Sequence, residues 1–169
     1  MGYERITDDP QFDGGIRESH EWRYRWAAQY IEPNDIVIDA ACGTAYSKKI
    51  LNTPNYFGVD RFDGGADIIA DLETWQPDFP FDVFVSIETI EHLSDDGVRN
   101  LLEIAKKARR YAIISTPIIP TKHRNEFHRQ DFTYEQVMHF LPNLVASATQ
   151  DSGDGTIHDM YGIACFRTG

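Results

Sequence analysis

Short apolar segments alternate with polar, helix-forming segments along most of the chain. Five apolar runs stand between turn residues: DIVIDA (35–40), NYFGVD (55–60), ADIIAD (66–71), FDVFVSI (81–87) and YAIIST (111–116). Most of them are continuously apolar, which is typical of parallel strands covered on both faces. Two later runs, NLVASATQ (143–150) and MYGIACFR (160–167), flank the turn sequence DSGDG and predict a pair of joined strands.

Three segments predict helices, and each begins at a residue that can cap it. They are SHEWRYRWAAQYI (19–31), SDDGVRNLLEIAKKARR (94–110) and TYEQVMHFLP (133–142), with Ser19, Ser94 and Thr133 as predicted N-caps. Gln136 completes a capping box with Thr133. Alternation of strands and helices, closed by a strand pair, predicts an α/β doubly wound sheet.

The connection after the second apolar run is too short for this scheme. Only a few residues, beginning at Arg61, separate NYFGVD from ADIIAD. A crossover between parallel strands normally needs a dozen or more residues. Either the helix between the second and third strands is reduced to a loop, or the strands end elsewhere.

Length and composition narrow the class of protein. With 169 residues we expect one domain over 1–169, preceded by a polar N-terminal arm over 1–18. The net charge of −11 argues against a large nucleic-acid surface. Cys42 and Cys165 stand in small or apolar surroundings, so we expect buried thiols and a reducing compartment. No signal peptide or membrane-spanning run is apparent, and we expect a cytoplasmic monomer or homodimer.

The stretch VIDAACGTAYSKKIL (37–51) combines a strand, an acid and a turn of small residues. Ligands of open α/β sheets bind beyond the carboxyl ends of the strands, where Asp39 would lie. Asp60 ends the next strand 21 residues later (60 − 39) and could accept hydrogen bonds from both ribose hydroxyls. The dinucleotide fingerprint G-x-G-x-x-G is absent, so a pyrophosphate fits poorly. An adenosine ligand with a cationic group fits the acids better.

Four segments, in chain order, carry a resemblance to one family. DAACGTAYS (39–47) resembles the first motif of class I S-adenosylmethionine-dependent methyltransferases. VDRFDGGADIIADLE (59–73) resembles their second-strand acid and third-strand Asp-Leu, and FDVFVSIETIEHLSDD (81–96) resembles their fourth-strand motif. AIISTP (112–117) followed by NEFHRQDFTYEQV (125–137) resembles the ubiquinone-type, or methyltransferase type 11-like, subgroup. Ala45 departs from the family pattern, which usually has glycine there.

The resemblance implies a Rossmann-like, mostly parallel seven-stranded sheet and S-adenosyl-L-methionine as the cofactor. It implies that the cofactor-binding residues are Tyr24, Asp39, Ala40, Ala41, Gly43, Asp60, Arg61, Asp71, Leu72 and Ile87.

The sequence SIETIEHL supplies candidates for catalysis. If the stretch is helical, Glu88, Glu91 and His92 share one face. His92 or His128 could take a proton from a hydroxyl acceptor. With His128, the same residues resemble the metal ligands of small-RNA 2′-O-methyltransferases. The same motif is frequent in metal-free relatives, and we expect no metal here; if one is present, its ligands are Glu88, Glu91, His92 and His128.

The segment TKHRNEFHRQ (121–130) is basic within an acidic chain. Lys122, Arg124 and Arg129 could bind an anionic group of the substrate, or they could belong to a solvated loop.

The function we expect is methyl transfer to a small acceptor, by O- or N-methylation, with an anionic acceptor as one possibility. The first alternatives are a metal-dependent RNA 2′-O-methyltransferase and a non-catalytic module that binds S-adenosylmethionine. A further alternative is another nucleotide-binding α/β protein, such as a reductase.

Overall fold

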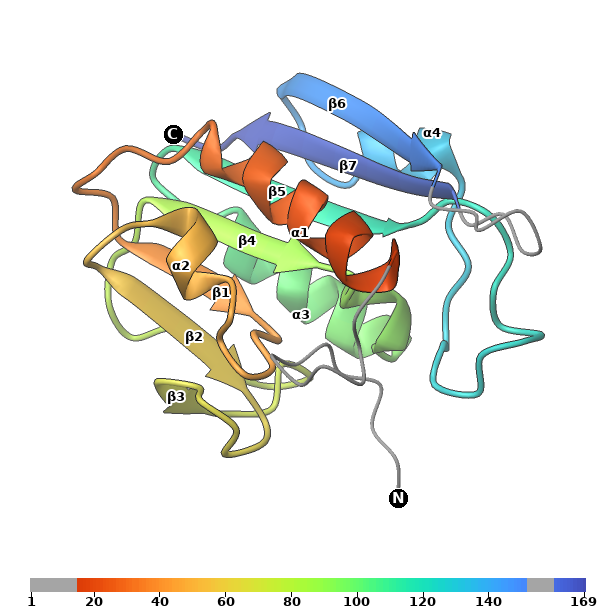
Figure 1. The fold of residues 1–169 in the computed structure, drawn as a ribbon, viewed down its shortest axis with the longest axis horizontal. Coiled ribbons are helices and arrows are strands. Elements are labelled where there is room, and N and C mark those ends of the chain that lie inside the picture. Colours follow the sequence, from red (N-terminus) through yellow and green to blue (C-terminus); the bar gives the residue numbers. More distant parts are fainter. Residues whose placement is uncertain (1–14, 152–159) are drawn as a thin grey trace.

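The computed structural model describes residues 15–151 and 160–169, and within them the chain folds around one seven-stranded sheet (Figure 1). β1, β2, β3, β4 and β5 run parallel, whereas β7 is antiparallel to β5 and β6. The predicted α/β sheet with an antiparallel C-terminal strand pair is confirmed. In spatial order the strands are β3 (Ile68–Ile69), β2 (Tyr56–Asp60), β1 (Val37–Ala40), β4 (Val83–Ile87), β5 (Tyr111–Pro117), β7 (Met160–Arg167) and β6 (Leu144–Asp151).

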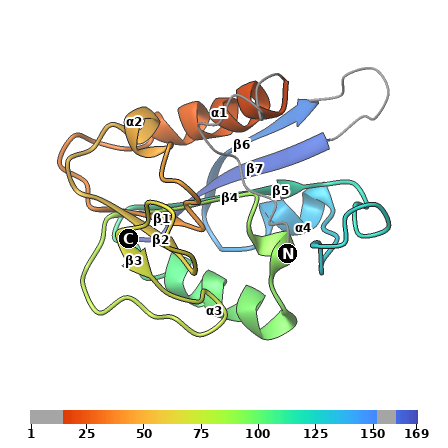
Figure 2. The ribbon, with the colours of Figure 1, turned by 60° about the horizontal axis from the view of Figure 1, so that its bottom comes forward.

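Helices cover both faces of the sheet (Figure 2). α1 (Gly15–Ala28) and the short α2 (Lys48–Leu51) lie on one face, and α3 (Asp95–Ala105) lies on the other. β1 and β4 are buried along their whole length, which explains their continuous apolar runs. Successive residues of β1 serve opposite faces: Val37 packs in the cluster with Tyr24 of α1, and Ile38 packs in the cluster with Leu101 of α3.

The remaining helix, α4 (Tyr134–Met138), joins the face of α3, because Val137 belongs to the same buried cluster as Leu101. None of the helices within residues 15–151 and 160–169 has the length and apolar character needed to cross a bilayer. Cys42 and Cys165 are buried free thiols, as predicted.

Four predicted helix boundaries were wrong: both ends of α1, which ends at Ala28 rather than residue 31, the end of α3, and the end of α4, which is Met138 rather than residue 142. α1 begins at Gly15, so Ser19 lies inside the helix and does not cap it, and residues 15–18, assigned to the N-terminal arm, are helical. The Ser19 hydroxyl instead donates to Gln150 and accepts from Arg23, four residues along the helix. α3, the second of the three predicted helices, ends at Ala105 rather than at residue 110. The other two predicted caps are confirmed: Ser94 accepts from Gly97, and Thr133 and Gln136 form the capping box.

The connection between β2 and β3 contains no helix, as the short spacing predicted. β3 pairs only with the last two residues of β2, Val59 and Asp60. The Asp67 carboxylate accepts a 2.9 Å hydrogen bond from the Gly58 amide, and the Asp67 amide donates to the Gly58 carbonyl. Because the chain returns only to the end of β2, it does not need a full crossover.

The order in which the chain adds strands to the sheet reverses between β1 and β4. From β1 the chain proceeds outward to β2 and β3, whereas from β4 it proceeds to β5 on the opposite side. The carboxyl ends of β1 and β4 therefore flank the switch point, where ligands of open α/β sheets bind.

Ser94 provides a test of the α3 boundary. Its side chain accepts from the Gly97 amide and also donates to the Glu73 carboxylate. We expect Ser94→Ala to lower the free energy of unfolding by about 1 kcal/mol, measured by urea denaturation. Ser94→Thr keeps the hydroxyl and should stay near the wild-type value. Equal stability of the alanine variant and the wild type would contradict the capping role.

Candidate active site at the carboxyl ends of β1 and β4

The turn after β1 uses backbone conformations that side chains rarely adopt. Ala41, Gly43 and Ala45 all have positive φ, at 60°, 58° and 56°. Such conformations cost a non-glycine residue about 1–2 kcal/mol. Glycine escapes this cost at position 43, whereas Ala41 and Ala45 bear it. Ala45 therefore adopts the glycine-like conformation at the position where the resemblance expects glycine.

Asp39 lies beneath this turn and is completely buried. Its carboxylate accepts hydrogen bonds from the hydroxyls of Tyr24 (3.1 Å), Ser47 (2.5 Å) and Tyr56 (2.9 Å). These donors belong to α1, the start of α2 and β2. Burial raises the pKa of Asp39 to about 6, although the three hydrogen bonds oppose that rise. Asp39 thus joins three elements to β1 and reaches no solvent.

Asp60, at the end of β2, holds the turn from the other side. One of its carboxylate oxygens accepts from the Gly43 amide at 2.9 Å, and the other accepts from the Phe62 amide at 3.1 Å. This carboxylate is 7% exposed. The two predicted acids therefore have different surroundings, because Asp39 is enclosed whereas Asp60 borders the turn itself.

The other predicted cofactor residues fall into two groups. Ala41 and Gly43 are partly exposed, and Arg61 and Asp71 are exposed. Tyr24, Ala40, Leu72 and Ile87 are buried and can shape a site only from below.

Glu88 follows β4 and departs from its predicted role. Its φ of 52° is left-handed, and the short 3₁₀ helix begins later, at Ile90. Glu88, Glu91 and His92 therefore do not share a helical face. The Glu88 carboxylate instead accepts from Ser115 at 2.7 Å and lies 3.5 Å from Nε of Arg23. Burial raises the pKa of Glu88 to about 8, and the Arg23 guanidinium partly offsets this rise.

Arg23 is the central residue that sequence reasoning missed. It is only 3% exposed, bonds to Ser19 and Gln150, and stacks 4.0 Å above the Tyr161 ring. It thereby links α1 to β6, β7 and the end of β4. One feature of the sequence could have indicated the burial of Arg23: it adjoins Tyr24 on the face of α1 that packs against the sheet. A cation on such a face needs a buried partner.

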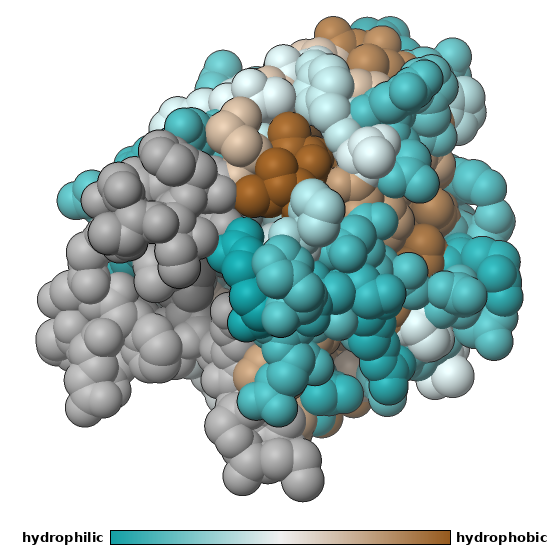
Figure 3. All heavy atoms as spheres, turned by 90° about the vertical axis from the view of Figure 1, so that its right-hand side faces the viewer, coloured by the Kyte–Doolittle hydropathy of each residue, from teal (hydrophilic) through white to brown (hydrophobic). Residues whose placement is uncertain are grey.

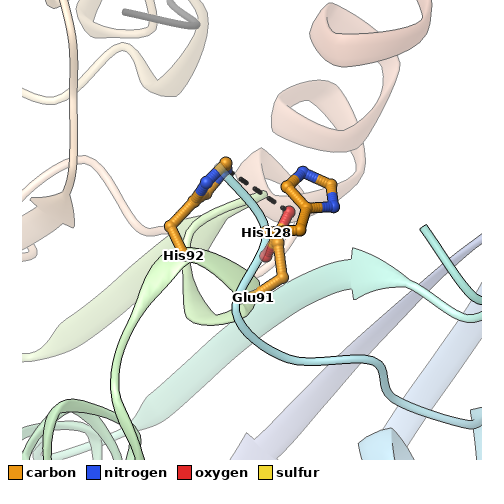
Figure 4. A group of neighbouring side chains, drawn as sticks. All are labelled: Glu91, His92 and His128. Carbon is orange, nitrogen blue, oxygen red and sulfur yellow. Dashed lines mark ion pairs between the residues drawn. The ribbon is translucent and has the colours of Figure 1, made fainter. Parts of the chain in front are cut away.

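A second cluster brings together the side chains of Glu91, His92 and His128 (Figure 4). Their candidate ligand atoms lie within 4.8 Å of one another, and the two histidine rings are 4.7 Å apart at 84°. The amides of Arg129 and Gln130 donate to the Glu91 carbonyl and fix the loop that carries His128.

The hydrogen bonds of His92 define its free nitrogen. Nδ1 lies 3.1 Å from the Phe127 carbonyl, which can only accept, so Nδ1 carries the proton. In the neutral imidazole, Nε2 then carries the lone pair, and it lies 4.0 Å from a Glu91 oxygen. This tautomer suits either a general base or a metal ligand, since ligating histidines commonly donate their other nitrogen to a carbonyl.

His128 is held on both sides. Nδ1 lies 2.6 Å from the Thr121 hydroxyl, and Nε2 lies 3.0 Å from Nδ2 of Asn125. The donor set of a carboxylate and two imidazoles fits a divalent transition metal. His128 would have to exchange one of these two partners for the ion.

The predicted substrate cations lie on the loop between β5 and α4. Lys122 and Arg124 are exposed, and Arg129 pairs with Glu73 at 3.3 Å. The loop projects on the side of the molecule shown in Figure 3, where hydrophilic residues cover much of the coloured surface.

Comparisons with known proteins identify the fold. No protein-family model and no curated protein sequence matches the chain. Among solved structures it is similar to N-methyltransferase NodS from Bradyrhizobium japonicum WM9 in complex with S-adenosyl-L-homocysteine, with a TM-score of 0.68, 16% identity, and coverage of 95% of this chain and 92% of that one. The chain has the fold of S-adenosylmethionine-dependent methyltransferases.

Two further similar structures differ in what they act on. Magnesium protoporphyrin IX methyltransferase from Synechocystis PCC 6803 has a TM-score of 0.67 at 14% identity, over 98% of this chain and 90% of that one. The small RNA methyltransferase HEN1 has a TM-score of 0.63 at 16% identity, over 99% of this chain but 27% of HEN1. At these identities the likeness is one of fold and does not select an acceptor.

The burial of Asp39 predicts a specific dependence of stability on pH. The folded protein binds the Asp39 proton more tightly than the unfolded chain, because burial raises its pKa to about 6. The stabilisation is complete below the ordinary pKa of about 4 and is lost as pH rises through about 6. Between these limits we expect the wild type to lose up to about 3 kcal/mol relative to Asp39→Asn, measured by urea denaturation.

The matched control is Asp71→Asn, which changes an exposed carboxylate. Its stability should follow the wild-type pH profile in parallel. A constant difference between Asp39→Asn and the wild type across this range would show that Asp39 does not titrate as its burial requires.

Proposed function

We propose that this chain is an S-adenosylmethionine-dependent methyltransferase. The observation that carries the proposal is the arrangement at the switch point of the sheet. There the small-residue turn after β1, held by Asp60, faces the segment after β4 that carries Glu88, Glu91 and His92. Cofactor and acceptor chemistry would thus meet at one edge. The shared fold with methyltransferases supports this reading.

The bound cofactor would supply a methyl group on a sulfonium, which is already a good leaving group. The protein then has mainly to align the acceptor and exclude water. An oxygen acceptor also loses a proton, and the lone pair on Nε2 of a neutral His92 would take it. The cofactor ribose would lie against Asp60, which borders the turn, with Asp39 supporting the turn from beneath.

The acceptor we propose is a small molecule, and an anionic group on it would favour binding. Lys122 and Arg124 are exposed on the loop that also carries His128. Both cations would therefore lie near the proposed reaction centre and could contact a carboxylate or phosphate of the acceptor.

The test of the cofactor is calorimetric titration of S-adenosylhomocysteine into the wild type and Asp60→Ala. We expect micromolar binding by the wild type and at least about tenfold weaker binding by the variant, because the ribose and the turn both lose their carboxylate. Asp63→Ala, an exposed acid in the same loop, should bind like the wild type.

The opposite outcomes separate the rival classes. A folded wild type that binds NADH and not S-adenosylhomocysteine would be another nucleotide-binding protein. Tight binding of the cofactor without turnover on a broad panel of acceptors would indicate a binding module.

A second candidate is metal-assisted 2′-O-methylation of RNA, favoured by the convergence of Glu91, His92 and His128. HEN1, one of the similar structures, is a small RNA methyltransferase. The net charge of −11 weighs against a broad RNA surface, so this remains the second candidate.

Manganese binding tests the second candidate directly, by electron paramagnetic resonance of added Mn²⁺. If the cluster holds a metal, we expect binding at micromolar strength that is lost in His92→Ala. His139→Ala removes an exposed histidine at the end of α4 and should bind like the wild type. Equal Mn²⁺ affinity in His92→Ala and the wild type would rule out a metal at this cluster.

A further inference from the structure

Residues of α1 and α2 line an open groove. Figure 2 shows both helices on the face of the sheet opposite α3. The groove has a volume of about 460 Å³, within the range of small-ligand sites. Its charged walls come from α1 and α2, and Tyr46, between β1 and α2, lines it as well. The groove adjoins the turn after β1, but none of its charged residues belongs to the proposed methyl-transfer site, so a ligand in the groove does not require the proposed function. Its lining includes Arg17, Glu21, Arg25, Tyr46 and Lys49.

The groove is basic in an acidic protein. Arg17, Arg25 and Lys49 oppose Glu21, which gives a local charge of +2 (3 − 1) in a chain of net charge −11. Arg17, Glu21 and Arg25 follow one another at intervals of four, so they form one stripe along α1. At physiological salt, charges beyond about 8 Å are largely screened, so the local excess dominates for a ligand in the groove.

Glu21 holds the two guanidiniums in place. One of its oxygens lies 3.1 Å from Nε of Arg17, and the other lies 3.1 Å from Nη2 of Arg25. A guanidinium has five N–H donors, so the ion pair with Glu21 leaves donors of Arg25 available. On the opposite wall Lys49 is exposed and, within the described residues, has no ion-pair partner.

The floor of the groove is an immobilised aromatic ring. Tyr46 is 7% exposed, its hydroxyl is hydrogen-bonded to Nδ1 of His20, and its ring packs edge-on against Tyr24 at 5.7 Å. Burial lowers the pKa of His20 well below its ordinary value, so the floor adds no positive charge. The cations thus surround a fixed, uncharged floor of the groove.

We propose that this groove binds a phosphate-bearing ligand. Arginine forks fixed by a carboxylate, facing a lysine, form the arrangement that recognises phosphate oxygens through several charge-assisted hydrogen bonds. The volume exceeds that of a single phosphate and accommodates a pyrophosphate or the phosphodiester of a nucleotide chain. The ring of Tyr46 supplies an apolar surface beneath it.

The test uses inorganic pyrophosphate as the probe, with binding measured by calorimetry at low salt on the full chain. The groove variant is Arg25→Glu with Lys49→Glu, two exposed positions. The matched control is Arg99→Glu with Lys106→Glu, which makes the same charge change at exposed positions of α3 and its end. We expect at least about tenfold weaker binding in the groove variant and less than about twofold change in the control.

Three measurements decide whether the groove binds phosphate. Absence of pyrophosphate binding by the wild type up to about 5 mM, the weak end of the affinity scale, would overturn the proposal. Equal weakening in both double variants would also overturn it, because net charge would then be the cause. Binding of S-adenosylhomocysteine, measured in the same samples, should be equal in both variants, which separates this site from the cofactor site.

A second arm identifies the source of the phosphate. A single-stranded RNA of about ten nucleotides should bind more tightly than pyrophosphate, with a steep salt dependence, if the ligand is a nucleic-acid backbone. Binding of pyrophosphate alone would indicate a small phosphate ester. In both cases the groove variant must lose the binding, or the proposal fails.

Discussion

The buried carboxylate of Asp39 is the constraint on which the rest of the site depends. A carboxylate without solvent must be hydrogen-bonded, and here three hydroxyls from α1, α2 and β2 supply the bonds. Removing any of these donors would leave part of a buried charge unsatisfied, so the three elements are fixed relative to β1. The strained turn directly above Asp39 can therefore keep its three positive φ angles.

The same edge of the sheet contains a second buried charged group, Arg23, which is stabilised by a different set of partners. Arg23 is covered by Tyr161 and bonded to Ser19 and Gln150, and it faces Glu88 across 3.5 Å. A buried arginine keeps its charge, so these polar and aromatic contacts, with the Glu88 carboxyl group, replace the water that the guanidinium has lost. The N-terminal helix is therefore tied to the end of β4 and to the C-terminal strands. The segment around the proposed reaction centre is thus positioned by contacts distant in sequence.

Local pattern was enough to predict most of the fold. Continuous apolar runs identified β1, β2, β4 and β5, and the spacing after Arg61 identified the missing helix. The position of Ser19 was wrong because the capping residue type also suits a hydrogen bond to Arg23 and Gln150, and only the tertiary structure distinguishes the two. The left-handed conformation of Glu88 was beyond reach for the same reason, since it depends on partners from other elements. The burial of Arg23 could have been suspected from its place on α1, but its partners could not be named from the sequence.

The arrangement of His92 explains why base and metal chemistry are hard to separate here. Both roles need the lone pair on Nε2, and the Phe127 carbonyl provides it in either case. The difference lies in His128, whose two nitrogens already have partners in Thr121 and Asn125. A base at His92 leaves that arrangement undisturbed, whereas a metal must displace one of the two partners. The hydrogen bonds at His128 therefore fit the proposed proton transfer by His92 without change, whereas a metal at this cluster would cost one of them.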